Sequence, residues 1–140
     1  MARCDPANVA VDWLDAYQAA SANEIVAMHR PDAVIKCTCG DPKEIHGRMH
    51  IFDYWQKRVI ESPALGLEQL KVDGRVAVIS YRTINGTVHA MLDVAIDGLI
   101  TYCRCGPTVD VVSKFDWIYA LSLAVTLMTT VAICIVLLTM

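Results

Sequence analysis

The chain opens with apolar residues at helical spacing. Val9, Trp13, Leu14 and Tyr17 fall on one face of a helix with 3.6 residues per turn. The preceding Asp5-Pro6 pair is a start signal, because Asp accepts the free N–H groups of the first turn and Pro suits the first helical position. The pattern therefore predicts an N-terminal helix with one buried face.

Two more helices and a short hairpin are predicted next. Ser21 to Glu24 fits a capping box, which predicts a short helix that ends before Pro31. Residues 32–39 alternate as a strand, a turn follows at 40–42, and 43–46 is predicted to return as a partner strand. A third helix is predicted over 48–61, because its apolar residues share one face: Ile51, Phe52, Trp55 and Val59.

Three evenly spaced turn signals follow without another helix. They are Asp73-Gly74, Asn85-Gly86 and Asp97-Gly98, dipeptides that tolerate the positive φ of tight hairpins. They separate four predicted strands, at residues 67–72, 75–84, 87–96 and 99–105. The prediction is an α+β domain over residues 1–105, with an antiparallel meander packed on helices that come first in the chain.

The last 24 residues, Trp117 to Met140, carry no charged side chain. As a helix they would extend about 36 Å, enough to cross a hydrocarbon core of about 30 Å. Trp117 and Tyr119 suit the headgroup layer at its start. We expect one C-terminal transmembrane helix over 117–140, and residues 106–116 as a linker to the bilayer.

Charge and the N-terminal sequence refine this expectation. The formal net charge is −3, with scattered Lys and Arg, so there is no basic patch and nucleic acid is not an expected partner. Asp5, Pro6 and Asp12 interrupt the apolar run that a signal peptide requires. We therefore expect a single-pass membrane protein with its N-terminal domain in the cytoplasm, where thiols stay reduced and no disulfide framework forms.

Three segments carry a resemblance to a known superfamily. They are WLDAYQAASANEIVAMHRPDAVI at the first two helices, Gly47-Arg48 at the start of the third, and VHAMLDVAIDGLITYCRC at the end of the meander. Together they resemble the nuclear transport factor 2-like superfamily over residues 9–105. That superfamily includes the ketosteroid isomerases and the SnoaL-like polyketide cyclases.

The resemblance implies a cone-shaped fold, in which a curved antiparallel sheet wraps around the long helix and leaves a deep apolar pocket. It also implies two acidic positions in the isomerase and cyclase branches. Asp93 matches the one on the penultimate strand, whereas the one on the first strand falls near Cys37, and no Asp or Glu lies between Val34 and Cys39. The pair of acids that isomerase chemistry uses is therefore incomplete.

Asp93 is the candidate catalytic residue. Strand alternation places His89, Met91 and Asp93 on one face, where an Asp among apolar neighbours would be desolvated and suited to donate a proton. A structural role, bonded to a donor at the pocket wall, is the alternative. The predicted pocket lining is listed in full as Trp13, Tyr17, Cys37, Trp55, His89 and Met91, although the aromatic members are equally consistent with core packing.

Two Cys-x-Cys pairs stand out, Cys37/Cys39 and Cys103/Cys105. If their strands met, four thiolates would gather as in a zinc site. On a flat strand, however, the two sulfurs of such a pair lie about 6.5–7 Å apart, a poor chelate. We therefore expect these thiols to pack as small hydrophobic groups, with no metal and no cofactor, and Cys37 shows no activating partner that would make it a nucleophile.

Three functions remain open. The first is a membrane-anchored module that binds a small apolar ligand or a partner protein. The second is an enzyme of the isomerase, cyclase or dehydratase type that uses Asp93 on a lipophilic substrate. The third is a self-associating adaptor whose pocket is filled by core side chains, and a homodimer is compatible with all three. The missing first-strand acid favours the first function.

Overall fold

The structure is a computed structural model that describes residues 4–107, with three helices and six strands. The helices are α1 (Pro6–Gln18), α2 (Ala22–Ala27) and α3 (Arg48–Glu61). The strands are β1 (His29–Cys37), β2 (Lys43–His46), β3 (Ala64–Asp73), β4 (Val76–Thr83), β5 (Gly86–Val94) and β6 (Ile100–Gly106). The α+β class predicted from the sequence is confirmed, as is the range of the third helix.

All six strands form one sheet in the order β2-β1-β6-β5-β4-β3. Strands β3 to β6 form the expected antiparallel meander, and β1 pairs with β2 as a hairpin. The expectation of a wholly antiparallel sheet is wrong, because β1 and β6 run parallel, with Cys37 opposite Cys105. This pairing joins the N-terminal hairpin to the meander and brings the two Cys-x-Cys segments side by side.

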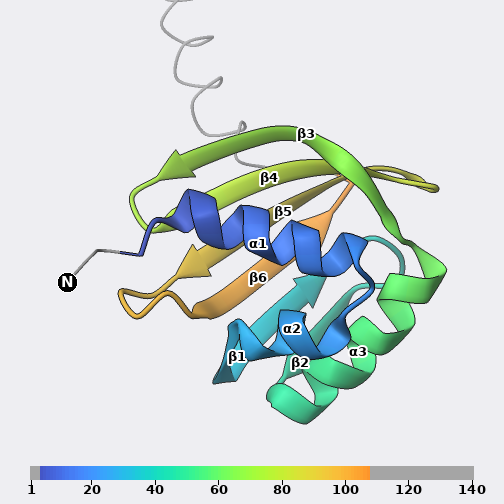
Figure 1. Ribbon diagram of the computed structural model, residues 1–140. Coiled ribbons are helices and arrows are strands. Elements are labelled where there is room, and N and C mark those ends of the chain that lie inside the picture. Colours follow the sequence, from blue (N-terminus) through green and yellow to red (C-terminus); the bar gives the residue numbers. More distant parts are fainter. Residues whose placement is uncertain (1–3, 108–140) are drawn as a thin grey trace, which may run out of the picture. The chain divides into compact units, whose positions relative to one another are not determined.

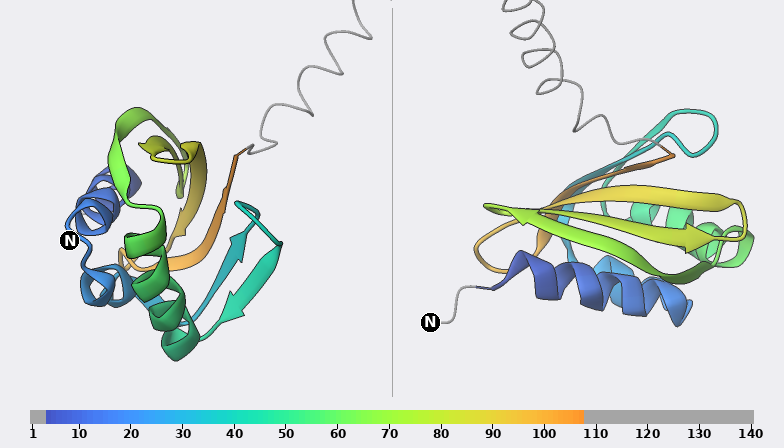
Figure 2. Two further views of the ribbon diagram at one scale, coloured as in Figure 1. Left: turned by 90° about the vertical axis from the view of Figure 1, so that its right-hand side faces the viewer. Right: turned by 90° about the horizontal axis from the view of Figure 1, so that it is seen from above.

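The helices cover one face of the sheet, and the sheet curves around them (Figures 1 and 2). Helix α1 lies across β3 and β4, whereas α3 packs against β1 and β2. Asp5 caps α1 as predicted, since its carboxylate accepts a hydrogen bond from the N–H of Ala7 at 2.9 Å. The capping box predicted at the start of α2 is wrong, because the Ser21 side chain makes no cap hydrogen bond.

Four large aromatic side chains occupy the space between α1, α3 and β4, and we call them the aromatic core: Trp13, Tyr17, Trp55 and Tyr81. Each is at most 1 % exposed. They pack edge to face, with the Tyr17 and Trp55 ring centres 5.0 Å apart and those of Trp13 and Tyr17 5.9 Å apart. The Tyr17 hydroxyl donates to the carbonyl of Ser62. The aromatic core therefore fills the space between α1, α3 and β4.

The three predicted hairpin turns are present, with positive φ at Gly74 (58°), Gly86 (118°) and Gly98 (85°). Among residues 4–107, no helix is long and apolar enough to cross a bilayer. The transmembrane helix predicted over 117–140 lies outside the described residues.

Candidate functional site

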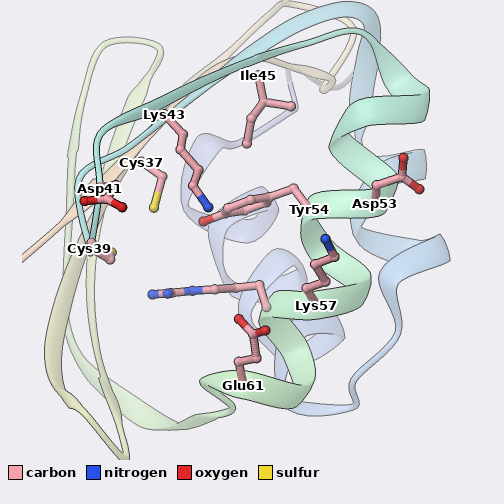
Figure 3. Close-up of a pocket in the computed structure, with 11 residues that line it drawn as sticks. Cys37, Cys39, Asp41, Lys43, Ile45, Asp53, Tyr54, Lys57 and Glu61 are labelled. Carbon is pink, nitrogen blue, oxygen red and sulfur yellow. The ribbon is translucent and has the colours of Figure 1, made fainter.

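A pocket of about 360 Å³ lies between α3 and the ends of β1 and β2 (Figure 3). Its wall combines the thiols of Cys37 and Cys39 with Tyr54 and Arg58 of α3 and the apolar side chain of Ile45. The remaining lining consists of Gly40 and charged residues of both signs: Asp41, Lys43, Asp53, Lys57 and Glu61. The pocket is therefore more polar than the apolar cavity expected from the sequence.

A more open depression of about 860 Å³ lies between residues 19–23 and α3. Its lining includes Phe52, Gln56 and Ile60 but no thiol, tyrosine or arginine side chain. The first pocket thus carries the more reactive set of groups.

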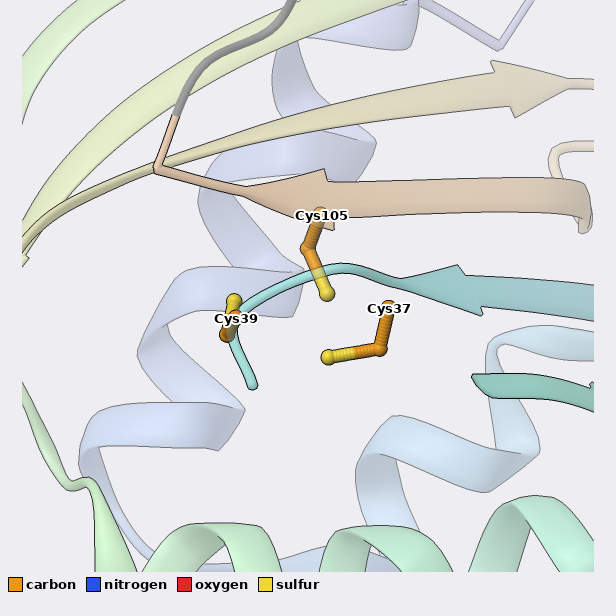
Figure 4. Close-up of side chains that lie close together, drawn as sticks. All are labelled: Cys37, Cys39 and Cys105. Atoms are coloured by element: carbon orange, nitrogen blue, oxygen red, sulfur yellow. The ribbon is translucent and has the colours of Figure 1, made fainter. Parts of the chain in front are cut away.

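Three thiols meet beside this pocket, and we call Cys37, Cys39 and Cys105 the thiol cluster (Figure 4). Their sulfur atoms all lie within 4.8 Å of one another. Cys37 and Cys105 are paired across the parallel β1–β6 ladder. Cys39 joins them because β1 ends at Cys37, and Thr38 then donates two hydrogen bonds to the carbonyl of Cys105, from its N–H at 2.9 Å and from its hydroxyl at 3.2 Å.

The fourth thiol of the two pairs, Cys103, lies apart from this cluster. It is fully buried opposite Ile35, and burial raises its pKa to about 12. The two strands do meet, but three of the four thiols gather rather than all four. The flat-strand argument failed at Cys39, because that residue lies beyond the end of the strand, where the backbone can turn its side chain toward Cys37.

The three clustered thiols differ in acidity. Hydrogen bonds from the thiols of Cys105 and Cys39 hold the pKa of Cys37 well below its ordinary value, with Tyr54 as a further donor. Hydrogen bonds to Cys37 and Cys39, together with burial, raise the pKa of Cys105. The Tyr54 hydroxyl lies 3.6 Å from the Cys105 sulfur. Cys37 is thus the thiol most ready to ionise, a setting that the sequence did not reveal.

Arg58 brings a positive charge to the same place. It follows Tyr54 by four residues on α3, so the two side chains share one helix face. Burial raises the pKa of the Tyr17 hydroxyl, and the positive charge of Arg58 works against that rise. None of the ion pairs found within residues 4–107 includes Arg58.

The site residues predicted from the sequence lie in three different places: the pocket, the aromatic core and the outer face of β5. Cys37 lines the pocket as expected. Trp13, Tyr17 and Trp55 instead belong to the aromatic core, which is the alternative that the sequence left open.

The other three predicted residues lie on β5, where alternation was predicted correctly but the wrong face was assigned to the interior. Ala90, Leu92 and Val94 are 0 % exposed and face the helices, so the partly exposed His89, Met91 and Asp93 lie on the opposite, outer face. His89 contacts Ser80 there, with Nδ1 2.6 Å from the hydroxyl oxygen. His89 and Met91 therefore do not line the described pocket, and a catalytic role for Asp93 stays a prediction.

The sequence analysis predicted no role for Tyr54 and Arg58, and it treated Cys39 and Cys105 as small hydrophobic groups. The signal available for the first two was their spacing of four on a helix that carries a separate apolar face. For the thiols, the signal was the repetition of Cys-x-Cys at the ends of two strands.

Comparisons with known proteins agree with this fold. No protein-family model and no curated protein matches the chain. Among solved structures, a ketosteroid isomerase-like protein of Kribbella flavida is 21 % identical, with a TM-score of 0.61 over 74 % of this chain and 78 % of that one. A polyketide cyclase-like protein of Sinorhizobium meliloti is 17 % identical, with a TM-score of 0.61 over 70 % of this chain and 93 % of that one. A SnoaL-like protein of Burkholderia thailandensis is 13 % identical, with the same TM-score over 70 % and 90 %. At these identities the likeness shows the fold alone: residues 4–107 have a fold similar to that of these SnoaL-like and NTF2-like structures.

Proposed function

We propose that this domain is a binding module for a small molecule, which it holds in the pocket between α3 and the ends of β1 and β2. The observation that carries the proposal is a pocket of about 360 Å³ whose wall includes Arg58 without a carboxylate partner among the described ion pairs. Ligand pockets in proteins generally measure about 300–1,000 Å³. The size therefore suits a compact ligand.

The lining defines the chemistry of that ligand. A guanidinium binds carboxylate and carbonyl oxygens with directional hydrogen bonds, and Arg58 supplies that group in the pocket wall. Ile45 offers an apolar contact at the β2 side. We therefore propose a small molecule with one acidic or carbonyl group and a short apolar part, in place of the wholly apolar ligand expected from the sequence.

The test is extraction of small molecules from the purified full chain in detergent micelles, followed by mass spectrometry. We expect a co-purifying molecule in the wild type and at least about a tenfold lower yield with Arg58→Met, because a hydrogen bond to a charged group contributes about 1.5–3 kcal/mol. Methionine keeps much of the aliphatic bulk, so the variant removes charge rather than packing.

Asp93→Asn is the matched control, since Asp93 lies on the outer face of β5. Its yield should equal that of the wild type. Loss of the molecule with Asp93→Asn and retention with Arg58→Met would contradict the proposal, because the molecule would then bind at Asp93 rather than at Arg58.

Two further parts of the proposal concern a lipid bilayer and a second copy of the chain. The uncharged residues 117–140 support anchoring in a lipid bilayer. The partly exposed outer face of the sheet, with Val78, Met91 and Tyr102, supports a homodimer. Flotation of the full chain with liposomes tests the first part, and chemical cross-linking within the bilayer tests the second.

A further inference from the structure

The thiol cluster has a geometry that the ligand-binding proposal does not use. Its three sulfurs lie within 4.8 Å of one another and come from two neighbouring strands and the turn after β1. Tetrahedral Zn²⁺ with Zn–S bonds of about 2.3 Å holds its sulfurs about 3.8 Å apart. The cluster therefore needs to contract by no more than about 1 Å to hold such an ion.

The backbone already fixes the three positions. The β1–β6 ladder sets Cys37 opposite Cys105, and the two hydrogen bonds from Thr38 to the Cys105 carbonyl hold the turn that carries Cys39. Ligands on hydrogen-bonded elements lose little conformational entropy when an ion binds. The site is preorganised to that extent.

The surroundings suit a divalent ion. Three thiolates and Zn²⁺ leave one negative charge, and Arg58 lines the adjoining pocket with no carboxylate partner among the described ion pairs. The Tyr54 hydroxyl, 3.6 Å from the Cys105 sulfur, is placed to donate to that ligand. Hydrogen bonds of this kind orient the ligands of metal sites and tune them.

The cluster supplies three ligands, and zinc takes four. Cys37 and Cys39 both line the pocket, so the remaining coordination position faces a cavity of about 360 Å³. Zinc sites that bind water or a substrate keep one position open in this way, whereas structural sites are closed by four protein ligands.

From these observations we infer that Cys37, Cys39 and Cys105 bind a Zn²⁺ ion whose fourth coordination position opens into the pocket. The inference does not depend on the identity of the organic ligand, because its test uses a metal ion alone.

The test is titration of the reduced, chelator-treated full chain in detergent micelles with Co²⁺, which reports thiolate ligands through sulfur-to-cobalt charge-transfer absorption. We expect this absorption to saturate at one ion per chain and to disappear when Zn²⁺ displaces the cobalt. Cys39→Ser and Cys37→Ser should each weaken binding by more than about 100-fold, beyond the 10–100-fold that loss of a supporting contact costs. Tyr54→Phe should weaken Co²⁺ binding by about 10–100-fold.

Cys103→Ala is the matched control, because this thiol lies on β6 two residues before Cys105 but outside the cluster. Circular dichroism establishes that each variant is folded, and Cys39→Ser is the variant least prone to unfold, since Cys39 is only partly buried. Absence of charge-transfer absorption in the wild type, or equal binding by Cys39→Ser, Cys37→Ser and the wild type, would overturn the inference. Either result leaves the ligand proposal intact, because extraction of the organic molecule is a separate measurement.

Discussion

The aromatic core and the thiol cluster lie on the same side of the curved sheet but are built in opposite ways. The aromatic core consists of four side chains at most 1 % exposed, packed ring edge against ring face. The thiol cluster adjoins a cavity of about 360 Å³ and collects small, ionisable groups. The closed region therefore stabilises the fold, while the open region, between α3 and the ends of β1 and β2, is available for chemistry.

The largest expected effect lies in the aromatic core. Trp55→Ala should lower the free energy of unfolding by about 3–5 kcal/mol, since the side chain is 1 % exposed and its removal leaves a cavity. Denaturant unfolding followed by circular dichroism measures this loss. Ile60→Ala on the same helix is the control, because Ile60 is 78 % exposed and should change stability by less than about 0.5 kcal/mol. A loss below about 1 kcal/mol for Trp55→Ala would mean that the core is not closed.

Substitutions of the buried Cys103 and of the partly exposed Cys39 should lower the free energy of unfolding by different amounts. Cys103→Ser places a hydroxyl at a 0 % exposed position and should cost about 1–3 kcal/mol, whereas Cys39→Ser, at a partly exposed position, should cost less than about 1 kcal/mol. The same unfolding measurement checks both variants. Equal losses would show that Cys39 belongs to the core rather than to the pocket.

A pH-dependent loss of stability is expected from His29, which is buried between α2 and β6. It is 0 % exposed, and its Nδ1 donates to the carbonyl of Ile25 at 2.7 Å. Burial lowers the pKa of His29, so the unfolded chain takes up a proton that the folded chain resists. Stability should therefore hold above the unfolded pKa of about 6.5 and fall below it, by up to about 1.4 kcal/mol per pH unit.

Unfolding between pH 7.5 and pH 5 measures this slope. His29→Asn should flatten the slope, whereas His50→Gln, at an exposed position on α3, should leave it unchanged. A slope that is the same in His29→Asn and the wild type would assign the pH dependence to another group.

The smallest effect is expected at Asp93. Asp93→Asn should change the free energy of unfolding by no more than about 0.5 kcal/mol, because the side chain is partly exposed on the outer face of β5. A loss above about 2 kcal/mol would show that the carboxylate has a buried partner and would restore the structural role considered from the sequence.

The sequence predicted well what is encoded locally. The bounds of α3 and the hairpin turns with positive φ at Gly74, Gly86 and Gly98 follow from apolar spacing and turn chemistry. The parallel β1–β6 pairing was not predictable in this way, since no local pattern records which distant strands meet.

The site was predicted less well for two physical reasons. Both faces of β5 carry apolar residues, so alternation alone does not say whether Leu92 or Met91 faces the helices. The thiol cluster requires both the parallel pairing of Cys37 with Cys105 and the turn at Thr38. Neither feature is visible in the spacing of the cysteines.

The central proposal is that a small molecule binds in the pocket beside the thiol cluster, and the accessibility of Cys39 tests it most directly. Alkylation of Cys39 by iodoacetamide is followed by mass spectrometry in the full chain as purified and after solvent extraction of small molecules, with a chelator and a reductant present throughout. We expect faster alkylation of Cys39 after extraction, with no change at Cys4, a partly exposed thiol outside the cluster. Equal rates at Cys39 before and after extraction, when a small molecule has been extracted, would contradict the proposal.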